Sequence, residues 1–390
     1  MKEMLNQLID AHFEEMVKIR RHLHENPELS FQEVKTPKLV AAFHRELGHE
    51  VREHVGGRGV VAKLISSKPG PVIALRADFD ALPIQDEKDV PYKSKVPGVM
   101  HACGHDGHTA ALLGLAKALN QMKESLSGTI VFIHQHAEEY APGGAIEMIR
   151  DGCMDGVDYV FGTHFWATEP LGKIQYRTGT IMAAADRLEI EIKGQGGHGA
   201  NPHLTKDSVV IASQLVLNLQ QIISRRIDPL EPAVISIGSF EAKNAFNVIA
   251  NTAKLSGTVR TLNEDTRDFI QSEIARVIEA TCQLHDANVE FEYVRGYPPV
   301  MNHKCETELL TEIAKTVPDV EIIEEIAPHM GGEDFAYYLQ HAKGTFFFTG
   351  AMNPALDFAP PHHHPMFDFD ERAMLIGAKT LGHIVLHYLG

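Results

Sequence analysis

The order of strand-like and helix-like runs is the feature that most constrains the fold of this chain. Up to about residue 185, short apolar and β-branched runs alternate with a helix-like run at residues 109–122. Runs of this kind are typical of a sheet that is covered by helices on its faces. The alternation therefore predicts an α/β domain. The predicted strands are residues 60–65, 72–77, 129–134 and 159–163.

A different order occupies residues 187–295. A period-2 strand, a long helix, two strands, a second long helix and a last strand follow one another, which predicts a small ferredoxin-like α+β sandwich. One face of its sheet would be covered by the helices, and the other face would be free to pair with a second copy. The predicted elements are residues 188–192, 208–227, 234–240, 253–259, 266–284 and 289–294.

The α/β pattern resumes after Pro298-Pro299, with a helix from Glu306, a strand at 345–349 and a helix at 371–388. We therefore expect one helix-covered mixed-sheet domain built from residues 1–185 and 297–390, with residues 186–296 inserted. Within the first part, Thr36-Pro37 resembles an N-cap with proline at the first helical position.

Charge and composition exclude several kinds of partner. The chain has 52 acidic and 36 basic residues, a formal net charge of -16 and no clustered basic patch, so neither nucleic acid nor an anionic membrane is expected as a partner. Residues 1–25 predict an amphipathic helix without the continuous apolar region of a signal peptide. The 4 cysteines are too scattered for a disulfide framework. These features predict a cytoplasmic protein.

Histidine is unusually frequent, at 23 of 390 residues, and the densest cluster is His101-Ala-Cys103-Gly-His105-Asp106-Gly-His108. A cysteine and a histidine two residues apart can face one ion where the chain turns, and Gly104 and Gly107 permit a tight backbone. Thiolate and imidazole ligands suit zinc, manganese, cobalt or nickel rather than magnesium. The alternative is a histidine-rich loop without function, but chance would seldom place so many ligand types together.

Three further segments add ligand types. Glu138-Glu139 follow a strand end, where one carboxylate could bind metal and the other could hold a water; the alternative is a surface acidic pair. His164 follows the next strand, although a lone histidine is more often structural. Pro361-His362-His363-His364-Pro365 is a histidine run in a loop near the C-terminus.

These motifs together resemble one family. The pattern Arg76-Ala-Asp78-Phe-Asp80-Ala-Leu-Pro83, then His101 to His108, then Glu138-Glu139, His164 and the His363-His-Pro365 run is similar to the M20 metallopeptidases. More narrowly, it resembles the branch of aminoacylases, hippurate hydrolases and auxin-conjugate hydrolases. The resemblance covers essentially the whole chain in order.

The resemblance implies a site with two divalent metal ions, of manganese, zinc, nickel or cobalt. Its general base would be Glu138, and Asp80 would orient ligands without binding metal. Asp78 stands roughly where other branches have a metal-binding histidine. His363 is assigned by matching His-x-Pro, and His362 is the alternative within the triple-histidine run. The implied ligands are Cys103, His105, Glu139, His164 and His363.

Cys103 would bind as a thiolate and could bridge the two ions. Its alternative role as a nucleophile is weaker, because a metal-bound thiolate attacks poorly and Glu138 already offers a base.

The inserted stretch has its own motif, Gly194-Gln-Gly-Gly-His198-Gly-Ala-Asn-Pro202-His203. In isolation His198 reads as a surface histidine, whereas the resemblance implies that it stabilises the oxyanion from a lid, often across a dimer. The resemblance also marks Asn247 and Arg260 as substrate-binding. Arg260 could bind a substrate carboxylate through two hydrogen bonds. The alternative is that Arg260 is an ordinary arginine on the surface of a strand.

The expected function is hydrolysis of N-acyl-L-amino acids, such as N-acetyl or benzoyl derivatives, to a carboxylate and a free amino acid. A dipeptidase or aminoacyl-exopeptidase of the same fold is the first alternative. A non-catalytic binding homologue is less favoured, because such a protein would be free to lose Glu138, His198 and the ligands. We expect a homodimer formed through the inserted domain.

Overall fold

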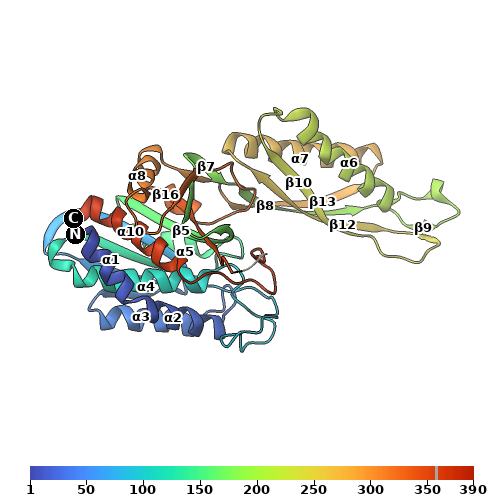
Figure 1. The fold of residues 1–390 in the computed structure, drawn as a ribbon. Helices are drawn as coiled ribbons and strands as arrows, with labels where there is room; N and C mark the ends of the chain where they lie inside the picture. Colours follow the sequence, from blue (N-terminus) through green and yellow to red (C-terminus); the bar gives the residue numbers. More distant parts are fainter. Residues whose placement is uncertain (356–358) are drawn as a thin grey trace. The chain divides into compact units, whose positions relative to one another are not determined.

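The computed structural model describes residues 1–355 and 359–390, and the chain divides into two compact units (Figure 1). Unit 1 contains Met1–Ile181, Val300–Ala327 and Asp334–Gly390. Unit 2 contains Met182–Pro299 and Pro328–Glu333. Each unit is described by itself. The predicted domain boundaries lie at 185/186 and 296/297. They concern parts that fold independently, and they remain predictions.

Unit 1 is built on an eight-stranded mixed sheet in the order β1-β2-β4-β3-β5-β16-β6-β15. Strand β3 runs parallel to both β4 and β5, and β16 runs parallel to β5, so the centre of the sheet is parallel. The strands are β1 Glu50–Val55, β2 Gly59–Ile65, β3 Lys68–Asp78, β4 Ser127–Gln135, β5 Tyr159–Pro170, β6 Lys173–Tyr176, β15 Ile322–Glu325 and β16 Lys343–Met352. A shorter pair is formed by β7 (Gly179–Met182) and β14 (Val300–Asn302).

Helices flank this sheet, which confirms the predicted α/β fold. The two central ones, α4 and α10, are buried over nearly their whole length and pack against each other. The helices of unit 1 are α1 Lys2–Ala11, α2 Phe13–Glu25, α3 Lys35–Glu46, α4 His105–Gln121, α5 Gly144–Arg150, α8 Lys304–Ala314, α9 Ala336–Leu339 and α10 Ala373–Leu389.

The single helix predicted for residues 1–25 is wrong, because the chain forms two helices that meet at His12. Helix α1 buries Leu5 and Ile9 and packs mainly on α10, beside which it lies near the chain termini in Figure 1. Helix α2 buries Met16 and Leu23 and packs on α4. The break lets each half direct its apolar face at a different partner.

The predicted N-cap at Thr36 is also wrong. Helix α3 begins at Lys35, and its exposed amides are capped by the carboxylate of Glu28 from an earlier turn of the chain. This carboxylate accepts the N–H groups of Val34, Lys35 and Thr36 at 2.9–3.0 Å. A carboxylate at a helix N-terminus satisfies free donors and opposes the helix dipole. Proline at 37 has no N–H that needs a partner.

Unit 2 has the predicted element order β-α-β-β-α-β. Its antiparallel sheet has the order β10-β12-β8-β13, and residues from one sheet face and from α6 and α7 form a separate apolar core. Asp207 caps α6 and Asn263 caps α7 through their side chains. The elements are β8 Ala184–Lys193, α6 Ser208–Arg226, β10 Ala233–Glu241, β12 Thr252–Thr261, α7 Glu264–Leu284 and β13 Asn288–Tyr297. A small ribbon pairs β9 (Gly197–His198) with β11 (Val248–Ile249).

Among the described residues, no helix combines the length and the apolar character that crossing a membrane would require.

Candidate metal centre

Ligand-type side chains gather where the central strands of unit 1 end. Strand β3 ends at Asp78, two residues before Asp80, and Glu138 and Glu139 follow the end of β4. The prediction that the next strand ends near residue 163 is wrong, because pairing with β16 carries β5 on to Pro170. The pairing of β5 with β3 nevertheless stops at Gly162, so His164 lies beyond the last residue that β3 covers.

The loop that carries Cys103 turns directly into α4. The helix was predicted from residue 109 and begins one turn earlier, at His105. Its N-cap, Gly104, has a φ of +97°, a conformation that is strained for any residue with a side chain. At Gly107 a Cβ atom would lie 2.4 Å from the ring of Phe369. Both glycines are therefore required, one for the turn and one for close packing.

The structure brings all five predicted ligands together in unit 1. Cys103 Sγ lies 3.3 Å from His164 Nε2. His105 Nε2 lies 3.9 Å from Glu139 Oε1, and the ligand atoms of Cys103, His105 and Glu139 all lie within 4.8 Å of one another. Glu139 Oε1 is in turn 3.2 Å from His363 Nε2. The five side chains thus form one continuous cluster with two ends, at His164 and at His363.

This cluster fits a metal. Within the part of the chain that the structure describes, His105 Nε2 and Glu139 Oε1 are buried and make no hydrogen bond, although Glu139 Oε1 lies 3.2 Å from His363 Nε2. Buried polar atoms without a hydrogen bond are costly, and a cation between them would remove that cost. Burial, followed by the charges of Glu139 and Glu138, holds the pKa of the Cys103 thiol well above its usual range. A bound cation would offset these effects, and the sulfur, nitrogen and oxygen donors suit a transition metal.

Asp80 orients two members of the cluster. His105 Nδ1 lies 3.1 Å from both Asp80 Oδ1 and the Asp80 carbonyl oxygen, so it is placed to donate there and leaves Nε2 for a metal. The other carboxylate oxygen of Asp80 accepts the Glu139 N–H at 2.9 Å and the Ser30 hydroxyl at 2.7 Å. A carboxylate behind a ligating histidine fixes its ring and raises its basicity.

His362 and His363 differ in what their rings can donate and accept. His362 Nε2 accepts the Ala167 N–H at 3.2 Å, so in the neutral ring the hydrogen is on Nδ1, which lies 3.8 Å from Cys103 Sγ. Burial lowers the pKa of His362 to about 3, which keeps this ring neutral. His363 has a φ of +64° and is anchored by donating its N–H to Ala102 at 2.8 Å.

Asp78 and His108 are tied to protein partners. Asp78 Oδ1 lies 2.7 Å from His108 Nδ1, and Asp78 Oδ2 accepts from Arg76 Nη1 at 2.6 Å. The remaining nitrogen of His108 accepts the Phe165 N–H at 2.9 Å. His108 thereby links α4 to β5 next to His164, a structural role that the ligand-rich motif did not reveal.

The predicted residues of unit 2 fall into two places. His198 in β9 pairs with Val248, and Asn247 accepts the Gly199 N–H at 2.8 Å, so His198 and Asn247 lie in the same small ribbon. The ribbon follows the Lys193 end of β8. Arg260 instead pairs with Ala185 at the other end of that strand and donates from Nε to Thr258 Oγ1 at 3.1 Å.

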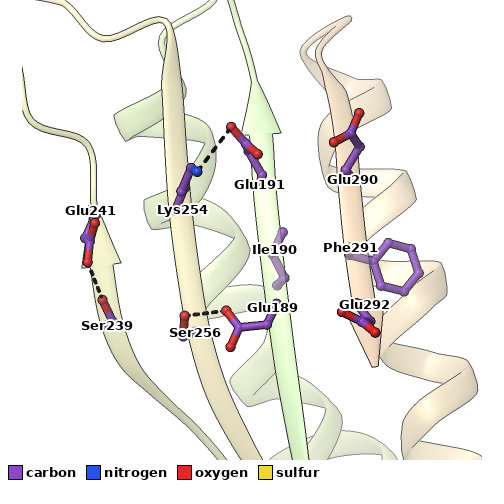
Figure 2. A pocket seen from close by; sticks show the side chains of 10 residues that line it. All are labelled: Glu189, Ile190, Glu191, Ser239, Glu241, Lys254, Ser256, Glu290, Phe291 and Glu292. Carbon is purple, nitrogen blue, oxygen red and sulfur yellow. Dashed lines mark hydrogen bonds and ion pairs between the residues drawn. The ribbon is translucent and has the colours of Figure 1, made fainter. Parts of the chain in front are cut away.

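A hollow on the open face of the unit 2 sheet has a different character (Figure 2). It is lined mainly by glutamates, several of which already bond to neighbours: Ser256 donates to Glu189, and Lys254 pairs with Glu191 at 3.8 Å. The lining contains neither histidine nor cysteine. This face is a solvated strand surface, and the candidate chemistry lies in the cluster of unit 1.

Comparisons with known proteins agree with this cluster. Residues 74–387 match the peptidase family M20/M25/M40. The chain is 57% identical over 388 residues to "Putative amidohydrolase YhaA" of Bacillus subtilis (strain 168), with 100% of this chain and 98% of that protein covered. It is 48% identical over 302 residues to "N-acyl-L-amino acid amidohydrolase" of Geobacillus stearothermophilus, covering 77% and 82%.

A solved structure shares the whole fold. The Bacillus subtilis YXEP protein, described as a dinuclear metal binding peptidase from the M20 family, superposes with a TM-score of 0.83 at 36% identity. The alignment covers 97% of this chain and 98% of that one.

Proposed function

The chain belongs to the peptidase family M20/M25/M40 and is a metal-dependent hydrolase, and from that premise we propose that it cleaves the amide bond of N-acyl-L-amino acids. The products are a carboxylate and a free amino acid. The observation that carries the proposal is a pair of buried atoms without a hydrogen bond, His105 Nε2 and Glu139 Oε1, next to the carboxylate of Glu138 and the ring of His363. The name of the Geobacillus relative supports the substrate class.

We propose that two divalent ions bind to Cys103, His105, Glu139, His164 and His363. Zinc, manganese, nickel and cobalt are the candidates that accept thiolate and imidazole ligands. When bound, such ions would polarise the scissile carbonyl and acidify a water. The dinuclear metal binding relative supports a count of two.

Ligand atoms of Cys103, His164 and His362 lie within 4.8 Å of one another, but the ring contacts support His363 over His362 as the fifth ligand. The Nε2 atom of His362 is engaged by a backbone N–H, and its Nδ1 carries the hydrogen that faces Cys103. A ligating nitrogen needs a free lone pair. His363 directs Nε2 at the carboxylate of Glu139, where a shared ion would lie between them.

Glu138 is the general base of the proposed reaction. It is 6% exposed, and its Oε2 lies 3.9 Å from His105 Nε2. Glu138 takes a proton from the attacking water and later delivers it to the leaving amine nitrogen, so that no net proton remains on the enzyme. Glu139, one residue on, points its Oε1 at the ligand cluster.

Unit 2 contributes to substrate binding in this proposal. His198 donates to the oxyanion of the tetrahedral intermediate. Asn247 holds the substrate, and Arg260 uses its remaining donors to bind the substrate carboxylate. We further propose that residues 186–296 are a ferredoxin-like lid through which two chains form a dimer.

The test is an assay of amino acid release from N-acetyl- and N-benzoyl-amino acids, with dipeptides measured in parallel. The protein is first stripped by a chelator and then reloaded with each candidate ion. We expect hydrolysis that returns with the ion and a preference for acyl amino acids. A preference for dipeptides would instead identify a dipeptidase. Full metal loading without turnover of either class would identify a binding homologue.

A further inference from the structure

Glu33 is a buried carboxylate that neither the ligand set nor the proposed chemistry uses. It lies between α2 and α3 and is 1% exposed. Its Oε1 accepts the backbone N–H of Ala137 at 2.9 Å, across 104 positions of sequence. Its own backbone is fixed, because Arg58 Nη1 donates to the Glu33 carbonyl oxygen at 2.7 Å. The carboxylate is therefore held in place and directed at one amide.

That amide belongs to the turn that presents Glu138. Ala137 has a φ of +51°, in the left-handed region that residues with a Cβ atom seldom adopt. On the other side of Glu138, the Glu139 N–H is held by Asp80 Oδ2 at 2.9 Å. Two carboxyl side chains therefore hold this turn by accepting backbone N–H groups. Glu33 accepts the Ala137 N–H before Glu138, and Asp80 accepts the Glu139 N–H after it.

We propose that Glu33 is a positioning residue for catalysis, which fixes Glu138 by accepting the Ala137 N–H. The Ala137 carbonyl oxygen accepts the Gly144 N–H at 3.0 Å, and Asp80 holds the Glu139 N–H, so Glu33 is the contact that fixes the Ala137 N–H. Without Glu33 this amide would lose its acceptor, and the strained turn could rotate at its start. The Glu138 carboxylate would then lose its fixed direction while Glu139 stayed in place. A general base depends strongly on such alignment. This inference rests on the proposed role of Glu138.

The proposed role of Glu33 depends on two properties of its side chain: an oxygen that accepts a hydrogen bond, and a length that brings this oxygen to the Ala137 N–H. Burial, followed by the charge of Asp80, raises the pKa of the Glu33 carboxyl to about 8, so this group is largely neutral at pH 7. Arg58 Nε lies 3.9 Å from Glu33 Oε2, too far for a hydrogen bond. Glu33→Gln keeps an acceptor oxygen at the same reach, whereas Glu33→Asp keeps the carboxyl group but is one methylene shorter. These two variants separate the reach of the acceptor oxygen from the need for a carboxyl group.

The experiment measures steady-state kinetics, metal content and backbone amide hydrogen exchange in the peptide that contains residues 136–140. For Glu33→Asp we expect kcat to fall about 10-fold or more, with KM and metal content unchanged. Exchange in that peptide should become faster in both the loaded and the metal-free protein. Glu33→Gln should keep both kcat and exchange near those of the unchanged protein.

Glu28→Gln and Glu28→Asp are the matched controls, since Glu28 also binds backbone amides but does so at the start of α3. They should lower thermal stability without changing kcat. The proposal is overturned if Glu33→Asp keeps kcat and slow exchange, or if Glu33→Gln loses as much as Glu33→Asp. Exchange at residues 136–140 is read without substrate, so it reports on Glu33 even if the proposed substrate class is wrong.

Discussion

Glu138 and Glu139 are adjacent in sequence, yet their surroundings give them different tasks. Glu139 Oε1 is a buried atom that lies near His105 and His363, whereas Glu138 stands beside the cluster. Glu138→Gln should therefore leave the metal bound and lower turnover about 10²–10⁴-fold, as general-base loss does. Glu139→Ala should lower metal affinity itself. Metal analysis and kcat measured on both variants check this, and near-normal activity of Glu138→Gln would place the base elsewhere.

Residue types in a short motif were the part of the site that could be predicted. Cys103, His105 and the glutamate pair stand out because ligand-forming residues cluster in the sequence. Ser30 and Glu33 could not be found in the same way, since they act through single hydrogen bonds to distant segments. No spacing rule links residue 33 to residue 137, and only the folded chain brings them together.

Three buried histidines form a chain that makes the protein sensitive to acid. His44 lies 2.9 Å from His49 and 3.0 Å from His134 through its two ring nitrogens. Burial lowers the pKa of His44 to about 2, that of His49 to about 4 and that of His134 to about 3. All three rings are therefore neutral in the folded protein but protonated in the unfolded chain below about pH 6.5.

The sign of the effect follows from these depressed values. The unfolded chain binds more protons than the folded one between pH 4 and 6.5, so stability is lost as pH falls through this window. Replacing His49 by Phe should remove one such proton and reduce the dependence of the unfolding free energy on pH by about 1 kcal/mol per pH unit. Urea unfolding of both proteins between pH 5 and 7 measures the two slopes. Equal slopes would show that His49 is not neutral in the fold.

At the scale of elements, Arg20 joins the segments that carry the ligands. This arginine of α2 is fully buried and donates to Asp106 on the first turn of α4 at 2.9 Å. It also donates to Asp368 and Glu371, which follow the histidine run, at 2.6 and 3.2 Å. Helix α2, the start of α4 next to the Cys103 loop, and the segment that follows the C-terminal histidine run are thus joined by a single guanidinium.

Replacing Arg20 by Met should destabilise the fold by about 3–5 kcal/mol, because it leaves buried carboxylates without their cation. Metal affinity should fall as well, since two ligand-bearing segments lose a common anchor. Arg21 is the matched control: it is largely exposed and pairs only with Glu371 among the ion pairs of the described residues, so Arg21→Met should cost about 1 kcal/mol or less. Urea unfolding and metal titration distinguish the two variants. Similar losses in both would contradict the anchoring role of Arg20.

The elements themselves were largely predictable, and their ends were not. Apolar periodicity located the central strands and long helices, because burial sets that pattern. The end of β5 depends on β16, which pairs with it from a distant part of the chain. The start of α3 depends on the cap from Glu28, which lies outside the helix. The first error concerns a strand from a distant part of the chain, and the second concerns a capping side chain that lies outside the helix. Neither contact is contained in the apolar pattern of the element itself.

The whole molecule divides the proposed chemistry between its two units, with Glu138 in unit 1 and His198 in unit 2. His198 lies exposed in the β9–β11 ribbon, outside the core of its unit. His198→Ala should therefore leave stability and metal content unchanged. Because the variant lacks the proposed oxyanion donor, its kcat/KM should be about 10²–10³-fold lower.

If two chains form a symmetric dimer through unit 2, His198 of one chain is expected to serve the site of the other. Mixing a His198→Ala chain with a Glu138→Gln chain tests this, because only a shared site would then combine an intact base with an intact donor. We expect activity to return in mixed dimers isolated with two different affinity tags, while each variant alone stays inactive. Verified mixed dimers without activity would mean that each His198 serves its own chain. A protein that stays monomeric at assay concentration would remove the dimer from the proposal, and the effect of His198→Ala would then arise within one chain.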